Sequence, residues 1–112
     1  DLDDTILRLQ AYAEAGADVL YAPGLRSADE VRAVVQALAP KPVNVLMGLA
    51  GVPLSVNQLQ DLGVRRISVG SSLARAAFGA LQRAALEIRE QGTFSYAEQS
   101  MPFAQLNDLF RR

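Results

Sequence analysis

The sequence predicts an α/β domain in which three short parallel strands alternate with helices. Strand patterns begin near positions 18, 43 and 66, so successive strands start 25 and then 23 residues apart, with a helical pattern in each interval. The joint from helix to strand also repeats, as Ala15-Gly16-Ala17-Asp18 and Leu62-Gly63-Val64-Arg65. Strands that alternate with helices in this way pair in parallel through right-handed crossovers.

The first helix and strand are predicted from a cap, an apolar spacing and a glycine. Asp3 or Asp4 is the expected N-cap of the helix, whose apolar residues recur at helical spacing. Gly16 suits the left-handed position that follows a last helical turn. Residues 18–22 then form the first expected strand.

The second helix is predicted from a capping box. Ser27 and Glu30 have the spacing at which a hydroxyl and a carboxylate each accept a hydrogen bond from a first-turn amide. The pattern predicts a helix from about Ser27 to Leu38, which a proline-containing turn ends. Residues 43–47 form the second expected strand.

The rest of the chain repeats this organisation. Ser55 and Gln58 form a second capping-box pattern at the start of a short helix, and residues 66–70 form the third expected strand. A long alanine-rich helix follows and extends to Gly92, with Ser71 or Ser72 as its cap. A short final helix is expected over residues 102–110.

The composition excludes several classes of function. Half of the residues are hydrophobic, 21% are charged and the formal net charge is −1, which is typical of a globular chain and offers no basic stripe for nucleic acid. The absence of cysteine and histidine excludes Cys/His zinc sites, disulfides and a histidine general base within this chain. The longest uncharged run, residues 42–60, is too polar for a membrane span. A cytoplasmic location is compatible with these features.

Two architectures fit three parallel strands: an open doubly wound sheet and an arc of a closed barrel. The 112 residues are about half of the roughly 250 that a full (β/α)₈ barrel needs. No strand is followed by a G-x-G-x-x-G or P-loop motif, which disfavours the nucleotide-binding open sheets. Either architecture leaves unpaired sheet edges, so we expect a partner or further polypeptide. Because residue 1 is aspartate and a helical pattern begins almost at once, we expect a chain cut from a longer one.

Candidate site residues follow the strands, because α/β proteins bind ligands outside the carboxyl ends of their strands. The segments 22–25, 48–51 and 70–72 should converge there. Glycine lets a backbone approach a ligand, and a helix N-terminus offers free amides. Gly48, Gly70, Ser71 and Ser72 therefore predict an anion site, although a serine pair at a helix start is also an ordinary cap.

Two further residues are candidates for binding. Asn44 lies in an apolar strand and shares a face with Leu46 and Gly48, so it either lines a barrel interior or is a structural asparagine. Arg75 lies one turn into the long helix, where a guanidinium could reach an anionic ligand or simply face solvent. We identify no catalytic residue and no metal-ligating cluster in the chain.

Three segments resemble the isocitrate lyase and phosphoenolpyruvate mutase superfamily, and most closely its phosphonomutase-like and carboxyphosphonoenolpyruvate mutase-like members. They are residues 10–24, 41–47 and 64–76, and the resemblance extends over essentially the whole chain. It implies that residues 1–92 are part of a (β/α)₈ barrel, with about strands six to eight, and that residues 93–112 are a C-terminal helical tail.

The resemblance also implies an activity. Members of this superfamily are Mg²⁺-dependent lyases and mutases that act on C–C or C–P bonds of small α-oxo or 2-hydroxy carboxylates. Their magnesium ligands and mobile catalytic loop lie upstream of the matching part, so we expect this chain to be inactive alone. The family arginine that meets a substrate carboxylate falls on Arg75. Other family positions fall on Pro23, near Leu46 and Gly48, and around Phe103, where the side chains differ, which argues against isocitrate or methylisocitrate as the substrate.

The implied partners are a small anionic carboxylate or phosphonate and further copies of the chain, with no nucleic acid and no membrane. Superfamily members exchange a helix between subunits, and the apolar residues of helix 73–91 and of the tail suit such an exchange. A competing hypothesis is a non-catalytic half-barrel that serves as an oligomerisation or anion-binding module. Another phosphate-binding barrel family is a third possibility.

Overall fold

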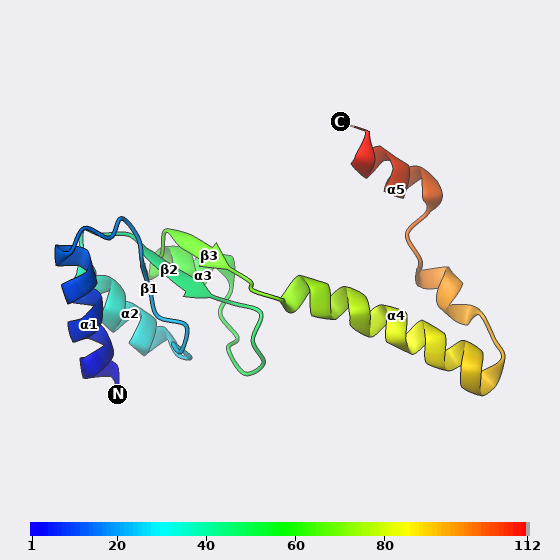
Figure 1. Ribbon diagram of the computed structural model, residues 1–112, viewed down its shortest axis with the longest axis horizontal. Helices are drawn as coiled ribbons and strands as arrows, with labels where there is room; N and C mark the ends of the chain where they lie inside the picture. Colours follow the sequence, from blue (N-terminus) through cyan, green and yellow to red (C-terminus); the bar gives the residue numbers. More distant parts are fainter. Residues whose placement is uncertain (112) are drawn as a thin grey trace. The chain divides into compact units, whose positions relative to one another are not determined.

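The computed structural model describes residues 1–111 and divides into two compact units, residues 1–73 and the residues from Ala74 onward. The first unit contains a three-stranded parallel sheet with the order β1-β2-β3 (Figure 1). Its elements are α1 (Leu2–Glu14), β1 (Leu20–Tyr21), α2 (Ala28–Leu38), β2 (Val43–Leu46), α3 (Val56–Asp61) and β3 (Arg66–Ser68). The expected alternation of helices and parallel strands is therefore confirmed.

The strands are shorter than the sequence patterns predicted. Within residues 18–22 only Leu20–Tyr21 form a strand, and within residues 66–70 only Arg66–Ser68 do. The reason is pairing: β2 is the central strand, and in the described chain β1 and β3 each pair with β2 alone. An edge strand is therefore regular only where it overlaps β2 in register, as Leu20 does with Val43.

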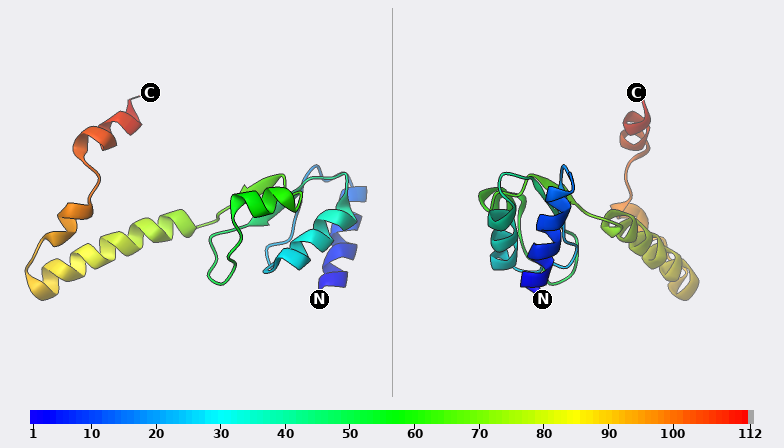
Figure 2. Two further views of the ribbon diagram at one scale, coloured as in Figure 1. Left: turned by 180° about the vertical axis from the view of Figure 1, so that it is seen from behind. Right: turned by 60° about the vertical axis from the view of Figure 1, so that its left-hand side comes forward.

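The core lies between the helices and one face of the sheet. Val43 and Val45 of β2 are fully buried on that face, and α1 and α2 pack beside each other over it (Figure 2). The other core side chains are supplied by α1, β1, α2, α3 and the adjoining loops: Leu9, Leu20, Ala22, Leu25, Val31, Val34, Leu38, Leu59 and Val64. The central strand thus supplies two of the most buried side chains of this core.

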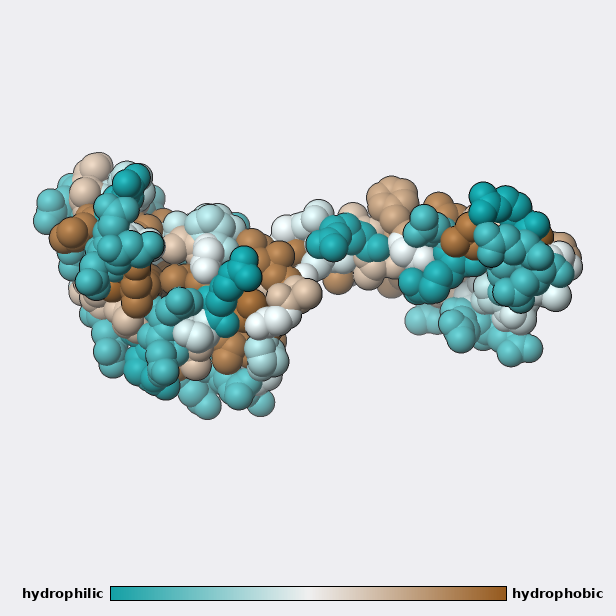
Figure 3. All heavy atoms as spheres, turned by 90° about the horizontal axis from the view of Figure 1, so that it is seen from below, coloured by the Kyte–Doolittle hydropathy of each residue, from teal (hydrophilic) through white to brown (hydrophobic). Residues whose placement is uncertain are grey.

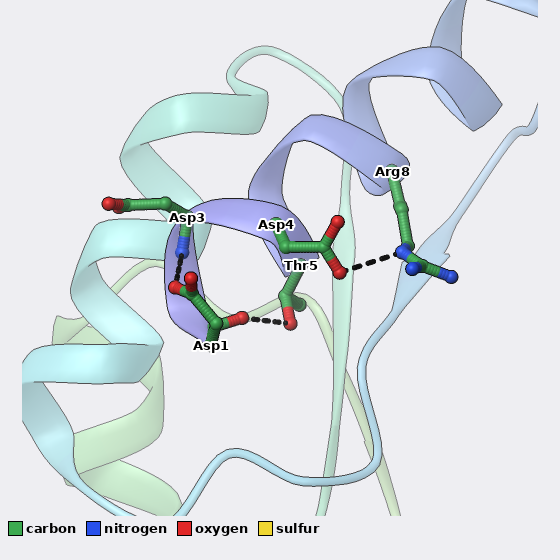
Figure 4. Close-up of polar contacts among 5 residues, drawn as sticks. All are labelled: Asp1, Asp3, Asp4, Thr5 and Arg8. Atoms are coloured by element: carbon green, nitrogen blue, oxygen red, sulfur yellow. Dashed lines mark hydrogen bonds and ion pairs between the residues drawn. The ribbon is translucent and has the colours of Figure 1, made fainter.

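The N-cap of α1 is Asp1, so the prediction of Asp3 or Asp4 was wrong. The Asp1 carboxylate accepts a hydrogen bond from the Asp3 amide at 3.0 Å (Figure 4). Leu2, the first helical residue, already packs against the core. The helix therefore begins two or three residues earlier than predicted. Asp3 and Asp4 instead occupy the first turn, where carboxylates suit the helix dipole, and Asp4 accepts a hydrogen bond from Arg8 Nε at 2.8 Å.

The two predicted capping boxes differ. The box of α3 is complete: Ser55 Oγ accepts from the Gln58 amide, and Gln58 Oε1 accepts from the Ser55 amide. In α2 only the serine half is present, because the Glu30 carboxylate accepts from the Arg26 amide at 2.7 Å rather than from Ser27. The α2 cap is therefore extended by one residue towards the preceding loop.

The second unit contains the rest of the long helix and the tail. Its elements are α4 (Ser72–Gln91), which begins in the last residues of the first unit, a 3₁₀-helix η1 (Ser95–Gln99), and α5 (Phe103–Phe110). None of these three helices has a buried side chain, and apolar atoms are exposed on the surface (Figure 3). The domain boundary expected at residue 92 stays a prediction. No helix within residues 1–111 has the length and apolarity needed to cross a membrane.

Candidate functional site

The loops that follow β2 and β3 meet at Gly48 and Ser72. A Cβ atom added to Gly48 would overlap the Ser72 hydroxyl and lie 2.6 Å from Ser72 Cβ, a distance that real Cβ atoms do not reach. Gly48 also has a φ of 82°, which strains any residue with a side chain. Only glycine therefore lets the end of β2 approach the start of α4 this closely.

The other two glycines of these loops, Gly51 and Gly70, permit turns of the backbone. Gly51 and Gly70 have φ values of 82° and 52°. A Cβ on Gly70 would make an ordinary contact with the Leu46 side chain at 3.5 Å, and a Cβ on Gly51 would meet nothing within 4 Å. These two glycines permit the turns, whereas Gly48 also permits the close approach.

The serine pair lies at the start of α4. The helix begins at Ser72, whose amide donates to the Val69 carbonyl at 3.0 Å, and Ser71 precedes it. Neither hydroxyl has a hydrogen-bond partner among residues 1–111, unlike the capping hydroxyls of Ser27 and Ser55. Both hydroxyls can therefore donate to a ligand beside the free amides of the helix terminus.

Asn44 is held on the opposite face of β2 from Val43 and Val45. Its side chain is 2% exposed, and its Nδ2 donates to Ser68 Oγ at 2.9 Å. Asn44 and Ser68 thus contact each other across the β2–β3 pair. The other amide atom, Asn44 Oδ1, is buried without a hydrogen-bond partner among the described residues, and such a group costs about 1–3 kcal/mol.

Arg75 belongs to the second unit and lies three residues after Ser72 on α4. Residues three apart share a face of a helix, so the guanidinium stands on the same side of α4 as the Ser72 hydroxyl. Arg75 is exposed and forms no ion pair within residues 1–111. The first unit brings together Gly48 and Ser72, and separately Asn44 and Ser68; Arg75 is linked to them through α4 alone.

The acidic residues form no metal site in the described part of the chain. No group of three or more Asp, Glu, His or Cys side chains there could hold a metal ion. At the start of α1 the carboxylates of Asp1 and Asp4 already have protein partners. Asp1 caps the helix and Asp4 pairs with Arg8 (Figure 4). These residues therefore do not fit the magnesium ion that the superfamily resemblance implies.

Sequence reasoning missed the contribution of α1 to a hollow beside the segment that follows β1. The hollow has a volume of about 360 Å³ and is lined by that segment, residues 21–25, together with Thr5, Arg8 and Tyr12. The three α1 residues are spaced three and four apart, so they lie on one face of the helix. That spacing was the available signal.

The profile of the family described as phosphoenolpyruvate phosphomutase matches residues 1–89. The crystal structure of a Burkholderia cenocepacia J2315 protein named as a lyase/mutase is 55% identical, with a TM-score of 0.93 over 100% of this chain and 40% of that one. Oxaloacetate acetylhydrolase in complex with its product oxalate is 26% identical, with a TM-score of 0.79 over 94% and 37%. An uncharacterised Mycobacterium tuberculosis protein is 34% identical over 107 residues, which are 95% of this chain and 38% of the relative. The chain thus spans about two fifths of the length of the proteins that it matches.

Proposed function

Because the chain belongs to the phosphoenolpyruvate phosphomutase family, we propose that it supplies the anion-binding end of the active site of a lyase or mutase. The family match confirms the expected superfamily, and the structural match confirms that the three parallel strands and their helices are part of its (β/α)₈ barrel. The proposed substrates are small α-oxo or 2-hydroxy carboxylates, or phosphonates, that lose or rearrange a C–C or C–P bond. The related oxaloacetate acetylhydrolase binds the small carboxylate oxalate, which supports this class.

The observation that carries the proposal is the close approach of Gly48 to Ser72. It brings two strand ends together beside the N-terminus of a 20-residue helix, and it leaves two serine hydroxyls without protein partners in the described chain. A carboxylate or phosphonate oxygen bound there would accept hydrogen bonds from amides and hydroxyls in a region of positive potential. Gly48 and Gly70 would admit the ligand, while Ser71 and Ser72 would donate to it.

Arg75 and Asn44 would complete the binding of the substrate. The Arg75 guanidinium can form two parallel hydrogen bonds with a carboxylate, which fixes the orientation of the ligand as well as its charge. Asn44 would line the barrel interior, with its unpartnered Oδ1 free to accept a hydrogen bond from a donor group of the substrate.

We further propose that the Mg²⁺ of the reaction is held by residues outside this chain. The described acidic residues do not fit such a site, so no chemical step is assigned to them. On this proposal the chain binds the anionic group but is inactive alone. A cytoplasmic location and the absence of a nucleic-acid partner also stay predictions.

A titration with oxalate tests the anion site. We expect oxalate to perturb the backbone NMR signals of Gly48, Gly70 and Ser72 with an affinity of about 1 mM, a binding free energy of about −4 kcal/mol. Arg75→Ala should weaken this binding about tenfold, because a charge-assisted hydrogen bond contributes roughly 1.5–3 kcal/mol. Arg83→Ala, on the same helix two turns later, is the matched control. Equal binding by both variants, or signals that move only elsewhere, would contradict the proposed site.

A second candidate function is a non-catalytic module that assembles through the second unit. It is favoured by the exposed apolar side chains of α4 and α5, among which Phe78, Leu81 and Phe103 are 69%, 63% and 85% exposed. Exposed apolar surface of this kind is typical of sites where another polypeptide packs, which supports this candidate. Exchange of α4 between copies of the chain is the arrangement we propose for it.

Complementation separates the two candidates. The chain is mixed with a polypeptide made from the part of the Burkholderia cenocepacia relative that it does not cover. The enzyme proposal predicts a one-to-one complex that gains Mg²⁺-dependent cleavage of a small 2-hydroxy or α-oxo carboxylate. A discrete oligomer of the chain alone, which neither binds the added polypeptide nor gains activity, would instead support the module.

A further inference from the structure

The turn between α4 and η1 is organised around one carboxylate. Glu87 Oε1 accepts three hydrogen bonds: from Thr93 Oγ1 at 2.8 Å, from the Ser95 amide at 2.6 Å and from Ser95 Oγ at 2.8 Å. Its Oε2 accepts a fourth from the Tyr96 amide at 3.2 Å. A side chain in the last turns of one helix therefore binds the first amides of the next.

This arrangement replaces the cap that η1 lacks. The N-cap residue of η1 is Phe94, which has no side chain able to accept a hydrogen bond from the helix. Glu87 supplies the missing acceptor across a turn in which Gly92, with a φ of 68°, reverses the chain after α4. The backbone conformation of Gly92 thus sets the start of the turn, and the Glu87 carboxylate holds its end.

We propose that Glu87 is a positioning residue that fixes the direction in which the C-terminal tail, residues 93–111, leaves α4. The tail carries large apolar side chains, including Phe103 and Phe110, that are more than four-fifths exposed. The surface that these side chains can reach depends on the direction of the turn. Loss of the Glu87 carboxylate should therefore release the tail without unfolding α4.

The charge of Glu87 makes this contact sensitive to acid. The hydrogen bond from the Thr93 hydroxyl, followed by that from the Ser95 hydroxyl, lowers the pKa of Glu87 below its ordinary value of 4.5. A lowered pKa means that the contact is at full strength above pH 4.5 and is lost as the pH falls through the pKa of the folded state. The other charged or titratable groups on the two helices near Glu87 are Arg83, Tyr96, Glu98 and the Arg89–Glu90 ion pair, in which the charges are 2.8 Å apart.

Amide exchange in the full chain tests the role of Glu87. Glu87→Ala should accelerate exchange of the Ser95 and Tyr96 amides about tenfold or more, the factor expected for loss of one net hydrogen bond. Glu87→Gln should give a smaller change, because its remaining carbonyl oxygen can still accept. Glu90→Ala is the matched control, since the Glu90 carboxylate pairs with its neighbour Arg89 on the same helix and forms no side-chain hydrogen bond with residues 93–111. The helix content of α4 should stay unchanged, because alanine favours helix.

The pH profile distinguishes a charge-dependent contact from simple packing. In the wild-type chain the chemical shifts of the Ser95 and Tyr96 amide protons should titrate together below pH 4.5, and in Glu87→Gln this transition should be absent. Equal exchange rates in Glu87→Ala and Glu90→Ala, or the same acid transition in Glu87→Gln, would overturn the proposal. A Ser95→Ala variant, which keeps the amide but removes the hydroxyl, should exchange at an intermediate rate.

Discussion

The close approach of Gly48 to Ser72 makes residue 48 the most restricted position of the candidate site. Gly48→Ala should destabilise the first unit by about 2–4 kcal/mol, because it adds a strained left-handed backbone to an overlap with Ser72. Gly51→Ala is the matched control, since Gly51 has the same φ of 82° but open space around its Cβ position, and it should cost only about 1–2 kcal/mol. Denaturant unfolding measures both.

A second-site change tests whether Ser72 is the cause. In the double variant Gly48→Ala/Ser72→Gly, part of the loss should be recovered, leaving a coupling free energy of about 1 kcal/mol or more between the two positions. Strictly additive losses would show that the two residues do not meet as described.

An apolar and a charged substitution at Asn44 should differ in their effect on stability. Asn44→Leu removes a buried oxygen that has no partner among the described residues, but it also removes the hydrogen bond from Nδ2 to Ser68. Because these two effects oppose each other, the free energy of unfolding should change by less than about 1 kcal/mol in either direction. Asn44→Asp places a charge at the same buried position and should lower the free energy of unfolding by about 3 kcal/mol or more. Denaturant unfolding of both variants measures the difference, and a Leu variant as unstable as the Asp variant would show that the Asn44 amide is needed for folding.

Sequence patterns selected the candidate site residues but did not predict their contacts. Gly48, Asn44 and the serine pair could be predicted because they interrupt apolar strands or follow them. The overlap that forbids a Cβ at Gly48, and the missing partner of Asn44 Oδ1, depend on how strands far apart in the sequence align. No local pattern contains that information.

At the scale of elements, the serines before three helices can be told apart by their contacts. Ser27→Ala and Ser55→Ala should each lower the free energy of unfolding by about 1 kcal/mol. Each removes a hydroxyl that accepts a hydrogen bond from a first-turn amide. Ser71→Ala should change stability by less than about 0.5 kcal/mol, because its hydroxyl has no partner within residues 1–111. Thermal unfolding measures all three. A loss at Ser71 as large as at Ser55 would make Ser71 an ordinary cap and weaken the anion site.

The start of α1 is the one helix start in the described chain that the sequence patterns misplaced. Apolar periodicity located α1 and α4, because that pattern reflects burial or amphipathic packing along many residues, whereas capping boxes located α2 and α3. The cap of α1 was misplaced because three aspartates stand near its start, and only the contact of Leu2 with the core decides among them. The box of α2 was half right for a similar reason: Glu30 is within reach of two consecutive amides, and the loop selects that of Arg26.

At the scale of the whole molecule, the exposed apolar side chains of α4 predict association. Leu81 is 63% exposed at the centre of the helix, and burying a leucine side chain contributes about 1.5–3 kcal/mol. Leu81→Lys should therefore shift the molar mass measured by light scattering towards the 12.0 kDa of a single chain. Ala76→Lys adds the same charge about 140° around the helix and is the matched control. If both variants keep the wild-type mass, this face of α4 is not an interface; if both dissociate, added charge alone explains the effect. A loss of association confined to Leu81→Lys would assign the apolar face of α4 to contact between copies, as helix exchange requires.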